Sequence, residues 1–546
     1  MTTLSTTLRD ETFHWLADDF DDAATAELQG VLAKAMAGDA AAVDELANRM
    51  SGPLEFGTAG LRGPVRAGRN GMNRAVVTRT TAGVATWLTA HGHVGGVVVV
   101  GRDARHGSEE FHGDAADVLA AAGFDVRVLP EPLPTPVLAF AVRHLGAVAG
   151  IQITASHNPP ADNGYKLYDA TGGQIVPPTD REVEAAIAGA PAAVSIQRSR
   201  TWQTVGPELL DAYLDRAAAL PKGTVRDLRI VLTPMHGVGG QTAVEALRRA
   251  GFTDVRVVRE QAVPDADFPT VAFPNPEEPG ATDLLLALAR ESDADLALAL
   301  DPDADRCAIG VPFDGGWRML RGDETGPLLG EYVLSTVDGA NPLVATTIVS
   351  SELLSSIAKA HQARYAETLT GFKWLVRAGD GLVFAYEEAL GLCVDPATVR
   401  DKDGISASIA AADLAATAKA AGKSIPDLLD GLALRHGVYV TEQIALRVPD
   451  LPKIGAMMAA LRQSPPAELA GSAVTAEDLL PDADVFRLRG KGLRVVVRPS
   501  GTEPKLKAYV EVVEPVAEES ELAAAKERAA RRLGRLRDEV TTLLTD

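Results

Sequence analysis

The sequence predicts an α/β protein built from three consecutive α/β domains with mixed or parallel sheets, followed by a C-terminal α+β domain. Short apolar runs rich in valine and leucine alternate with helical stretches, and this layout recurs along most of the chain. Near the C-terminus the order changes to strand-like runs around a loop, followed by a long charged helix. A chain of 546 residues also has room for three or four domains at about 150 residues each.

The individual elements follow from hydrophobic spacing. Phe13, Leu16 and Phe20 recur at helical intervals within a lead-in that spans residues 7–50. The sequence predicts strands at 94–100, 125–129, 229–232, 255–258, 296–300, 343–349, 383–386, 493–497 and 506–513, and helices at 109–122, 241–250, 352–359 and 518–544. We expect the last helix to present a solvated face. The expected domain limits are 1–207, 208–325, 326–440 and 441–546.

Composition excludes several classes of protein. Apolar residues make up 46% of the chain, and 50 glycines with 33 prolines are too few for a low-complexity chain, which predicts a soluble globular protein. A net charge of −21 disfavours binding to nucleic acid or to anionic membranes. Cys307 and Cys393 are too few for a disulfide framework or a zinc site, although one disulfide stays possible. Without a secretory signal or an apolar membrane span, we expect a cytoplasmic location.

A serine-containing loop, Thr-Ala-Ser-His-Asn-Pro-Pro, follows the apolar run Ile151–Ile153. Loops at the ends of strands are where α/β enzymes place reacting groups, so Ser156 is a candidate nucleophile beside His157. Lys166 is a candidate proton partner. Two alternatives stay open, because Asn-Pro-Pro is strong turn chemistry and Lys166 is equally typical of a surface lysine.

Three carboxylates at alternate positions, Asp301, Asp303 and Asp305, follow the apolar run 296–300. They can converge on one hard cation, with magnesium as the expected ion. An EF-hand is excluded because Arg306 stands at its sixth position and Pro312 at its twelfth. The alternative is a solvated acidic turn, but three acids packed behind an apolar strand repel one another without a positive partner.

A loop between the last two predicted strands can cradle a phosphate. It combines Arg498, the hydroxyls of Ser500 and Thr502, and the backbone around Gly501, followed by Lys505. A plain hairpin turn is the alternative.

Two further loops carry weaker signals. Glu387 and Glu388 follow the strand 383–386 and can accept hydrogen bonds from sugar hydroxyls, although adjacent acids also begin exposed helices. The glycine-rich stretch 56–63 contains Arg62, which is consistent with an anion site or a turn.

Taken together and in this order, these loops resemble the α-D-phosphohexomutase superfamily, which contains the phosphoglucomutases and phosphomannomutases. The resemblance extends from Phe56 to about Val513 and rests mainly on Thr-Ala-Ser-His-Asn-Pro and on Asp-x-Asp-x-Asp-Arg. The stretches 101–103, 233–237 and 370–374 also match. Residues 57–63 and 386–389 look most like the phosphoglucomutase-2-type branch, some of whose members act on pentose phosphates.

The resemblance implies four domains around a central active-site cleft, each of which contributes one loop. It implies that Ser156 is the phosphorylated serine and that one Mg²⁺ is held by Ser156 and the three aspartates. The remaining implied site residues are Arg62, His157, Lys166 and Lys373 for catalysis, and Arg306, Glu387, Glu388, Arg498, Ser500, Gly501, Thr502 and Lys505 for substrate binding.

The implied activity is interconversion of glucose 1-phosphate and glucose 6-phosphate through a phosphoserine enzyme, with a sugar bisphosphate as intermediate and activator. Ala389 stands where many hexose mutases have serine, so phosphopentomutase and phosphomannomutase are the alternatives. A phosphatase would not need the second phosphate loop. We further expect a small sugar phosphate as the partner, a monomer or weak homodimer, and a C-terminal domain that acts as a mobile lid.

Overall fold

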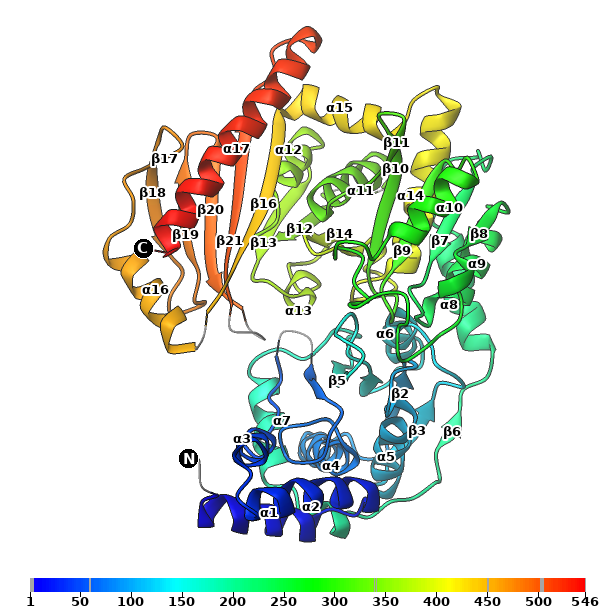
Figure 1. Ribbon diagram of the computed structural model, residues 1–546. Helices are drawn as coiled ribbons and strands as arrows, with labels where there is room; N and C mark the ends of the chain where they lie inside the picture. The colour runs from blue at the N-terminus through cyan, green and yellow to red at the C-terminus, as the bar shows by residue number, and fades with distance from the viewer. Residues whose placement is uncertain are drawn as a thin grey trace. The chain divides into compact units, whose positions relative to one another are not determined.

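The computed structural model describes residues 4–57, 60–337, 339, 341–448, 451–500 and 505–545, and it confirms the expected α/β class (Figure 1). The chain divides into two compact units. The first comprises Met1–Met319 and Gly391–Asp413, and the second comprises Leu320–Leu390 and Leu414–Asp546. Among the helices of the described chain, none combines the length and the apolar character that a membrane crossing requires.

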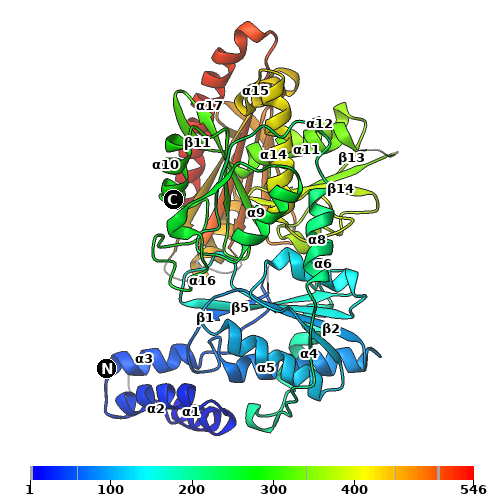
Figure 2. The ribbon, with the colours of Figure 1, turned by 90° about the vertical axis from the view of Figure 1, so that its right-hand side faces the viewer.

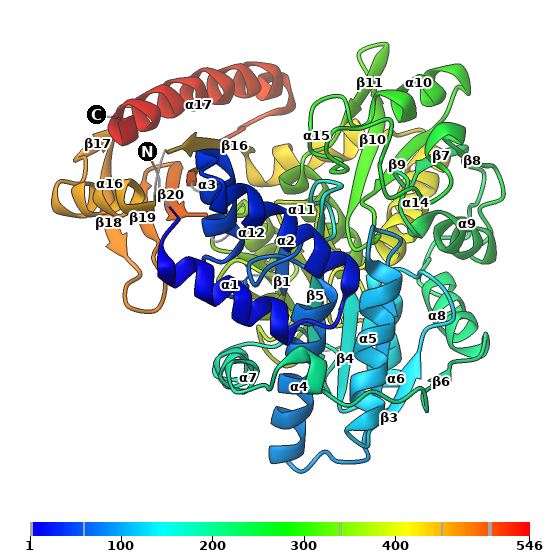
Figure 3. The same cartoon turned by 60° about the horizontal axis from the view of Figure 1, so that its bottom comes forward.

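The N-terminal lead-in folds into helices, as its spacing predicts. Helices α1 (Thr6–Asp18), α2 (Asp22–Met36) and α3 (Ala40–Arg49) pack in sequence, and Figure 3 shows α1 and α2 side by side. Leu28 of α2 and Leu46 of α3 are fully buried in a small core of their own. The lead-in is therefore a helical layer added to the first unit.

The N-terminal sheet places the serine loop. Its strands are β1 (Leu61–Pro64), β2 (Val97–Arg102), β3 (Asp125–Val128), β4 (Ala149–Ile153), β5 (Asp162–Asp169) and β6 (Gln203–Thr204). The order is β1-β5-β4-β2-β3-β6, with β4 parallel to β2 and antiparallel to β5. Figure 2 shows α4 (Arg74–Ala90) and α5 (Ser108–Ala121) below this sheet and α6 (Thr135–His144) above it. Burial on both sides explains why every residue of β4 is buried and why Gln152 is its single polar residue.

The second sheet places the acidic loop. Its strands are β7 (Ile230–Thr233), β8 (Val255–Val257), β9 (Leu296–Leu300), β10 (Cys307–Phe313) and β11 (Gly316–Met319), in the order β11-β10-β9-β7-β8. Every residue of β9 is buried. Because β10 pairs antiparallel with β9 and opposes Cys307 to Leu300, the acidic stretch between them is a hairpin connection.

The helices of the second-sheet domain include α8 (Glu208–Ala218), α9 (Gly239–Arg249) and α10 (Asp283–Glu291). Helix α10 packs on β7 and β9, and α9 packs on α8. Together with the sheet these helices form the layers of an α/β domain.

The third sheet belongs to the second unit. There β12 (Leu343–Thr347) lies between β13 (Arg364–Thr368) and β14 (Leu382–Glu387), and both neighbours run parallel to it. Its helices in this unit are α11 (Gly322–Thr336), α12 (Leu353–Ala360), α13 (Phe372–Leu375) and α15 (Ile425–His436). Strand β15 (Gly391–Cys393) and the first part of α14 (Gly404–Ala420) belong to the first unit.

The C-terminal sheet is antiparallel. Its strands are β16 (Val438–Arg447), β17 (Glu468–Leu469), β18 (Ser472–Asp478), β19 (Phe486–Gly490), β20 (Leu493–Pro499) and β21 (Lys505–Glu514), in the order β16-β21-β20-β19-β18-β17. Helices α16 (Leu451–Gln463) and α17 (Leu522–Thr545) accompany it, and Figure 1 shows α17 lying along the sheet. Leu536 and Val540 of α17 are fully buried, so this helix has an apolar inner face besides the expected solvated one.

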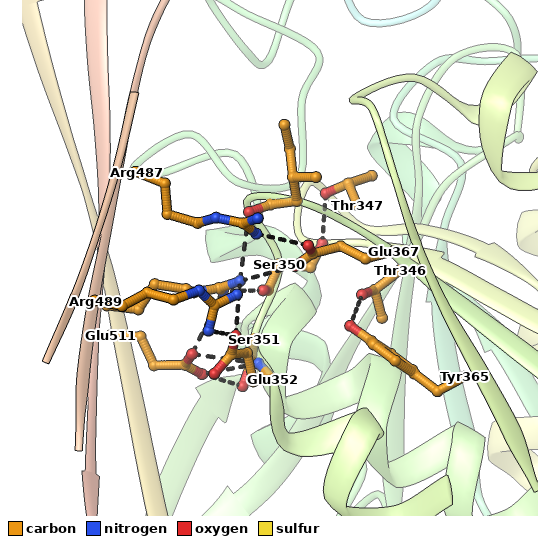
Figure 4. A network of polar contacts seen from close by, with 12 residues as sticks. Thr346, Thr347, Ser350, Ser351, Glu352, Tyr365, Glu367, Arg487, Arg489 and Glu511 are labelled. Carbon is orange, nitrogen blue, oxygen red and sulfur yellow. Dashed lines mark hydrogen bonds and ion pairs between the residues drawn. The ribbon is translucent and has the colours of Figure 1, made fainter. Parts of the chain in front are cut away.

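Buried ion pairs join the C-terminal sheet to β13 of the third sheet. Arg494 of β20 is 4% exposed, and its guanidinium lies 3.3 Å from Glu367 Oε1 and 3.4 Å from Glu511 Oε2. Arg487 of β19 lies 2.6 Å from Glu367 Oε2. Figure 4 shows Arg487 reaching Glu367, and Glu511 beside Ser351. The C-terminal sheet is therefore attached to the third-sheet region by charged as well as apolar contacts.

Candidate active site

Ser156 lies in the turn after β4 and is 2% exposed. Its φ is +55°, a left-handed conformation that an L residue keeps only where its surroundings hold it. The hydroxyl Oγ donates to Asp301 Oδ2 at 2.9 Å and lies 3.1 Å from His157 Nδ1. The turn that the sequence offered as an alternative is present, and within it the serine hydroxyl is directed at the acidic cluster.

The acidic loop connects β9 to β10, and its three aspartate side chains are fully buried. Carboxylate oxygens of Asp301, Asp303 and Asp305 lie within 4.8 Å of one another. The backbone N–H of Arg306 donates to Asp301 Oδ1 at 3.0 Å, and Thr135 Oγ1 donates to Asp303 Oδ2 at 2.6 Å. Complete burial rules out the solvated acidic turn.

Two buried lysines compensate the acids. Lys166 of β5 is fully buried, with Nζ 2.7 Å from both Asp303 Oδ2 and Asp305 Oδ2, so the surface-lysine alternative is wrong. Lys402 Nζ lies 3.1 Å from Asp305 Oδ2. Burial acts to lower the pKa of Lys166, but the two carboxylates outweigh it and raise that pKa, which keeps the ammonium charged. Against the effect of burial, Lys166 and Lys402 lower the pKa of Asp305.

The donor set of this cluster fits a hard divalent cation. Asp303 Oδ1 and Asp305 Oδ1 are buried, and no donor among the described residues reaches either atom. Buried carboxylate oxygens normally have a partner. Burial and the neighbouring carboxylates also raise the pKa of Asp301 well above its ordinary value. Three converging carboxylates, two of which have an unpaired oxygen, are the kind of ligand set that Mg²⁺ prefers.

Basic groups surround the serine loop. Arg62 of β1 donates from Nη1 to Asn158 Oδ1 at 3.1 Å, and Arg306 follows the acidic loop directly. Burial and the guanidinium charges of Arg306 and Arg62 lower the pKa of His157 well below its ordinary value, so its imidazole is neutral near pH 7. The structure thus brings Arg62, His157, Lys166 and Arg306 to the surroundings of Ser156 and the acids.

The other predicted site residues belong to the second unit. Lys373 lies on α13 and Glu387 ends β14, and both are half-buried. Glu388 Oε2 accepts hydrogen bonds from Thr347 Oγ1 at 3.2 Å and from Ser350 Oγ at 3.1 Å. Because the two glutamates end a strand and enter a turn, the exposed-helix alternative is wrong.

The predicted phosphate loop connects two neighbouring strands of the C-terminal sheet. Arg498 lies near the end of β20, Lys505 begins β21, and these strands pair antiparallel. The backbone N–H of Ser500 donates to Lys505 O at 2.8 Å. Gly501 and Thr502 lie outside the described residues. The hairpin is confirmed, and the contact with phosphate stays a prediction.

Sequence reasoning missed Lys402 and Thr135, both of which contact the acidic cluster. Lys402 stands in the run Asp-Lys-Asp-Gly just before α14. A lysine bracketed by acids in front of an apolar, alanine-rich helix is a signal that could have found it. Thr135 carried no such signal, because it is one more residue of a helix that is buried over most of its length.

The ends of these strands bring together a serine hydroxyl, carboxylates that can bind a cation, and two lysines. α/β enzymes carry out phosphoryl transfer with groups of this kind. The chain belongs to the phosphoglucomutase/phosphomannomutase family. Models of the alpha/beta/alpha domains I, II and III of that family match residues 53–193, 211–312 and 321–434, and the model of its C-terminal domain matches residues 444–529.

Individual relatives agree with this assignment. The chain is 44% identical over 454 residues to a protein of Haemophilus influenzae named "Probable phosphomannomutase", covering 81% of this chain and 93% of the relative. It is 35% identical over 517 residues to "Probable phosphoribomutase" of Schizosaccharomyces pombe, covering 84% and 86%. A crystal structure of a phosphoglucomutase/phosphomannomutase family protein from Burkholderia thailandensis has the same fold, with a TM-score of 0.68 at 23% identity over 88% of this chain and 97% of that one. Members of this family are mutases, so the chain is an isomerase.

Proposed function

We propose that this chain is a phosphosugar mutase that carries its phosphoryl group on Ser156. The observation that carries the proposal is the 2.9 Å hydrogen bond from Ser156 Oγ to Asp301 Oδ2, in a cluster where Lys166 pairs with Asp303 and Asp305. A buried serine hydroxyl beside a cation site is positioned to give and to receive a phosphoryl group.

In the proposed cycle, the phosphoserine gives its phosphoryl group to the free hydroxyl of a sugar monophosphate. The bond from phosphorus to Ser156 Oγ breaks as the bond to the sugar oxygen forms. The sugar hydroxyl gives up its proton and Ser156 Oγ takes one up, which yields a sugar bisphosphate and the free serine hydroxyl. The bisphosphate turns over, and its other phosphoryl group returns to Ser156. On this return the proton of Oγ must leave, and Asp301 Oδ2 at 2.9 Å and His157 Nδ1 at 3.1 Å are acceptors beside it.

The acidic cluster and the basic groups around it support the same assignment. Bound Mg²⁺, held by Asp301, Asp303 and Asp305 with Ser156, would offset charge on the phosphoryl oxygens. Arg62 and Arg306 supply further positive charge, and Lys373 is proposed to join them.

The remaining proposed roles concern the substrate. Glu387 is proposed to bind sugar hydroxyls, and the loop of Arg498, Ser500 and Lys505 is proposed to bind the phosphate that is not transferred. The Glu388 carboxylate accepts from Thr347 and Ser350, which supports a role in shaping the sugar loop beside its proposed contact with substrate.

For the sugar we propose glucose 1-phosphate and glucose 6-phosphate, with mannose and pentose phosphates as alternatives. The family description names phosphoglucomutase and phosphomannomutase, and the Haemophilus influenzae relative is named as a probable phosphomannomutase. The relative named phosphoribomutase favours a pentose phosphate as the second candidate. A coupled assay on all three sugar phosphates decides among them. A pentose phosphate with kcat/KM more than about tenfold above that of glucose 1-phosphate, a difference of about 1.4 kcal/mol, would make the chain a phosphopentomutase.

The serine assignment is tested by phosphorylation. After incubation with a sugar bisphosphate, intact-mass analysis and peptide mapping should find one phosphoryl group on Ser156, and Ser156→Ala should carry none and show no turnover. Ser195→Ala, at an exposed serine of the same unit, serves as the matched control. Full turnover in Ser156→Ala would overturn the proposal.

Three other expectations stay proposals. These are a cytoplasmic location, a monomer or weak homodimer, and domain limits at 1–207, 208–325, 326–440 and 441–546. Size-exclusion chromatography with light scattering measures the second of them.

A further inference from the structure

Arg105 lies in the turn between β2 and α5 and is 4% exposed. Its guanidinium donates to backbone carbonyl oxygens of the turn that contains Ser156. Nη2 donates to Ser156 O at 2.5 Å and to Asn158 O at 2.8 Å, and Nη1 donates to Pro159 O at 2.9 Å and to Asp162 O at 3.2 Å. Arg105 is therefore a buried donor that serves four backbone carbonyls of this turn.

Asp103 holds the other side of the same turn. Its Oδ2 lies 3.3 Å from Arg105 Nε and accepts a hydrogen bond from Thr154 Oγ1 at 2.6 Å. The Thr154 hydroxyl oxygen in turn accepts the backbone N–H of Ser156 at 2.9 Å. Asp103 is 1% exposed and also accepts the hydroxyl of Ser108 at 2.6 Å, which fixes its carboxylate. The backbone of Ser156 is therefore hydrogen-bonded on both sides, with its N–H bound to Thr154 and its C=O bound to Arg105.

These two hydrogen bonds matter because the backbone of Ser156 is in a left-handed conformation. Such a conformation costs an L residue of order 1–2 kcal/mol and persists only where several contacts impose it. If it relaxed, the Cα–Cβ bond of Ser156 would turn away and Oγ would leave the 2.9 Å contact with Asp301 Oδ2. A displacement of about 1 Å in a reacting group can cost about a hundredfold in rate.

We infer that the Asp103–Arg105 ion pair is the positioning device of the nucleophile, which keeps Ser156 Oγ aimed at the acidic cluster. The role requires arginine, because a planar fork of donors serves several carbonyls at once and an ammonium group does not. Phe268 supports the guanidinium from one side, with its ring centroid 5.0 Å from the central carbon. The inference rests on the proposed role of Ser156, and it assigns to Arg105 no contact with the substrate.

The test is Arg105→Lys, which keeps the positive charge but removes the planar guanidinium that donates to several carbonyls at once. The inference predicts that kcat falls at least about tenfold while KM stays within about twofold, because the substrate-binding groups are untouched. The rate at which a sugar bisphosphate phosphorylates Ser156, followed by intact mass, should fall in parallel with kcat. An unchanged phosphorylation rate and kcat in Arg105→Lys would overturn the inference.

Arg226→Lys is the matched control. Arg226 also donates to backbone carbonyls, at 2.7 Å to Ala250 O and 2.7 Å to Val225 O, pairs with Asp413 at 3.1 Å and lies over Phe252 at 5.1 Å. Its contacts resemble those of Arg105, but they involve no residue of the serine turn. We expect kcat to be unchanged in Arg226→Lys. Equal losses of kcat in the two variants would mean that Arg105 is merely structural, and the inference would fall.

Thr154→Val decides the question if Arg105→Lys does not fold. It removes only the hydroxyl between Asp103 and the Ser156 N–H, and it should lower kcat with KM unchanged. Unchanged kcat in this variant would again overturn the inference. Ser156→Ala separates the two proposals: if it stays active, the proposed function fails, whereas an inactive Ser156→Ala with unimpaired Arg105→Lys and Thr154→Val defeats the positioning role alone.

Discussion

At the scale of single residues, Lys166 is the group on which the buried acids depend most directly. Its ammonium lies 2.7 Å from both Asp303 and Asp305, and all three side chains are fully buried. Removing one partner of a buried ionic cluster leaves uncompensated charge, which is far more costly than losing a surface pair. The proposed Mg²⁺ would be a second source of positive charge beside these acids.

Lys166→Met should therefore make stability depend on magnesium. With a chelator present, the free energy of unfolding should fall by about 3–5 kcal/mol. With Mg²⁺ in excess the loss should be smaller, because a ligand that binds the folded state stabilises it. Thermal unfolding of the parent and the variant in both conditions measures the difference, with the exposed Lys34→Met as control. Equal losses with and without Mg²⁺ would contradict a cation site at these acids.

At the scale of elements, the start of α12 meets a buried acid from β21. Glu511 accepts a hydrogen bond from Ser351 Oγ and another from the Glu352 N–H at 3.1 Å. Burial raises the pKa of Glu511 from 4.5 to about 7, and nearby Asp323 adds to the rise although Arg494 opposes it. The folded protein therefore holds this proton more tightly than the unfolded chain does.

This shift predicts a pH dependence of stability. The contribution of Glu511 is fully present below its unfolded pKa of 4.5 and is lost as the pH rises to its folded value of about 7. Glu511→Gln cannot ionise, so its unfolding temperature should fall less than that of the parent between about pH 5 and about pH 8. Glu468→Gln, at an exposed residue of β17, should behave like the parent. An identical fall in the parent and Glu511→Gln would show that Glu511 does not titrate in this range.

The β20–β21 hairpin carries a prediction about the distal phosphate. Arginine holds a phosphate through two parallel charge-assisted hydrogen bonds, which lysine does not reproduce. Arg498→Lys should be impaired, and Arg498→Ala should lose roughly 2–4 kcal/mol of transition-state stabilisation in kcat/KM. Ser156 should still accept a phosphoryl group in both variants. Unchanged kcat/KM in Arg498→Ala would show that this loop is only a turn between two strands and does not bind the distal phosphate.

The two central loops could be predicted from the sequence because their signals are local. Turn-forming residues around Ser156 and alternating acids from Asp301 each follow an apolar run. Helix α6 could not be predicted, since nearly all of its residues are buried and it has no polar face to reveal a helical period. The role of Arg105 could not be predicted for another reason, because it arises from contacts with a segment far away in the chain.

At the scale of the whole molecule, the second unit alters the expectation of a C-terminal lid. Val485, Val496 and Tyr509 of the C-terminal domain pack against Ile348 and Val349. Moving this domain alone would break that contact. It would also leave the buried guanidinium of Arg494 without its Glu367 partner, which costs several kcal/mol of stability. We therefore expect α12 and the C-terminal sheet to move as one body during the catalytic cycle.

Paired labels test that expectation. With cysteines introduced at the exposed Lys359 of α12 and Thr475 of β18, the distance between the labels should not change when a sugar bisphosphate is added. The native Cys307 and Cys393 are buried and should not react. In Arg494→Met the same distance should become broader or longer. A clear change in the label distance on addition of the bisphosphate, in the protein with native Arg494, would show that the C-terminal domain moves independently as a lid.

The segment Gly391–Asp413 has a consequence for synthesis on the ribosome. The first unit is interrupted at Met319 and resumes only with this segment, whose Lys402 pairs with Asp305 and whose Asp401 accepts the hydroxyl of Tyr168 at 2.7 Å. A nascent chain that has emerged through the second sheet therefore still lacks partners for groups that are buried in the finished protein. Vectorial folding must wait, or proceed through a partly open first unit, until the chain has been extended past Asp413.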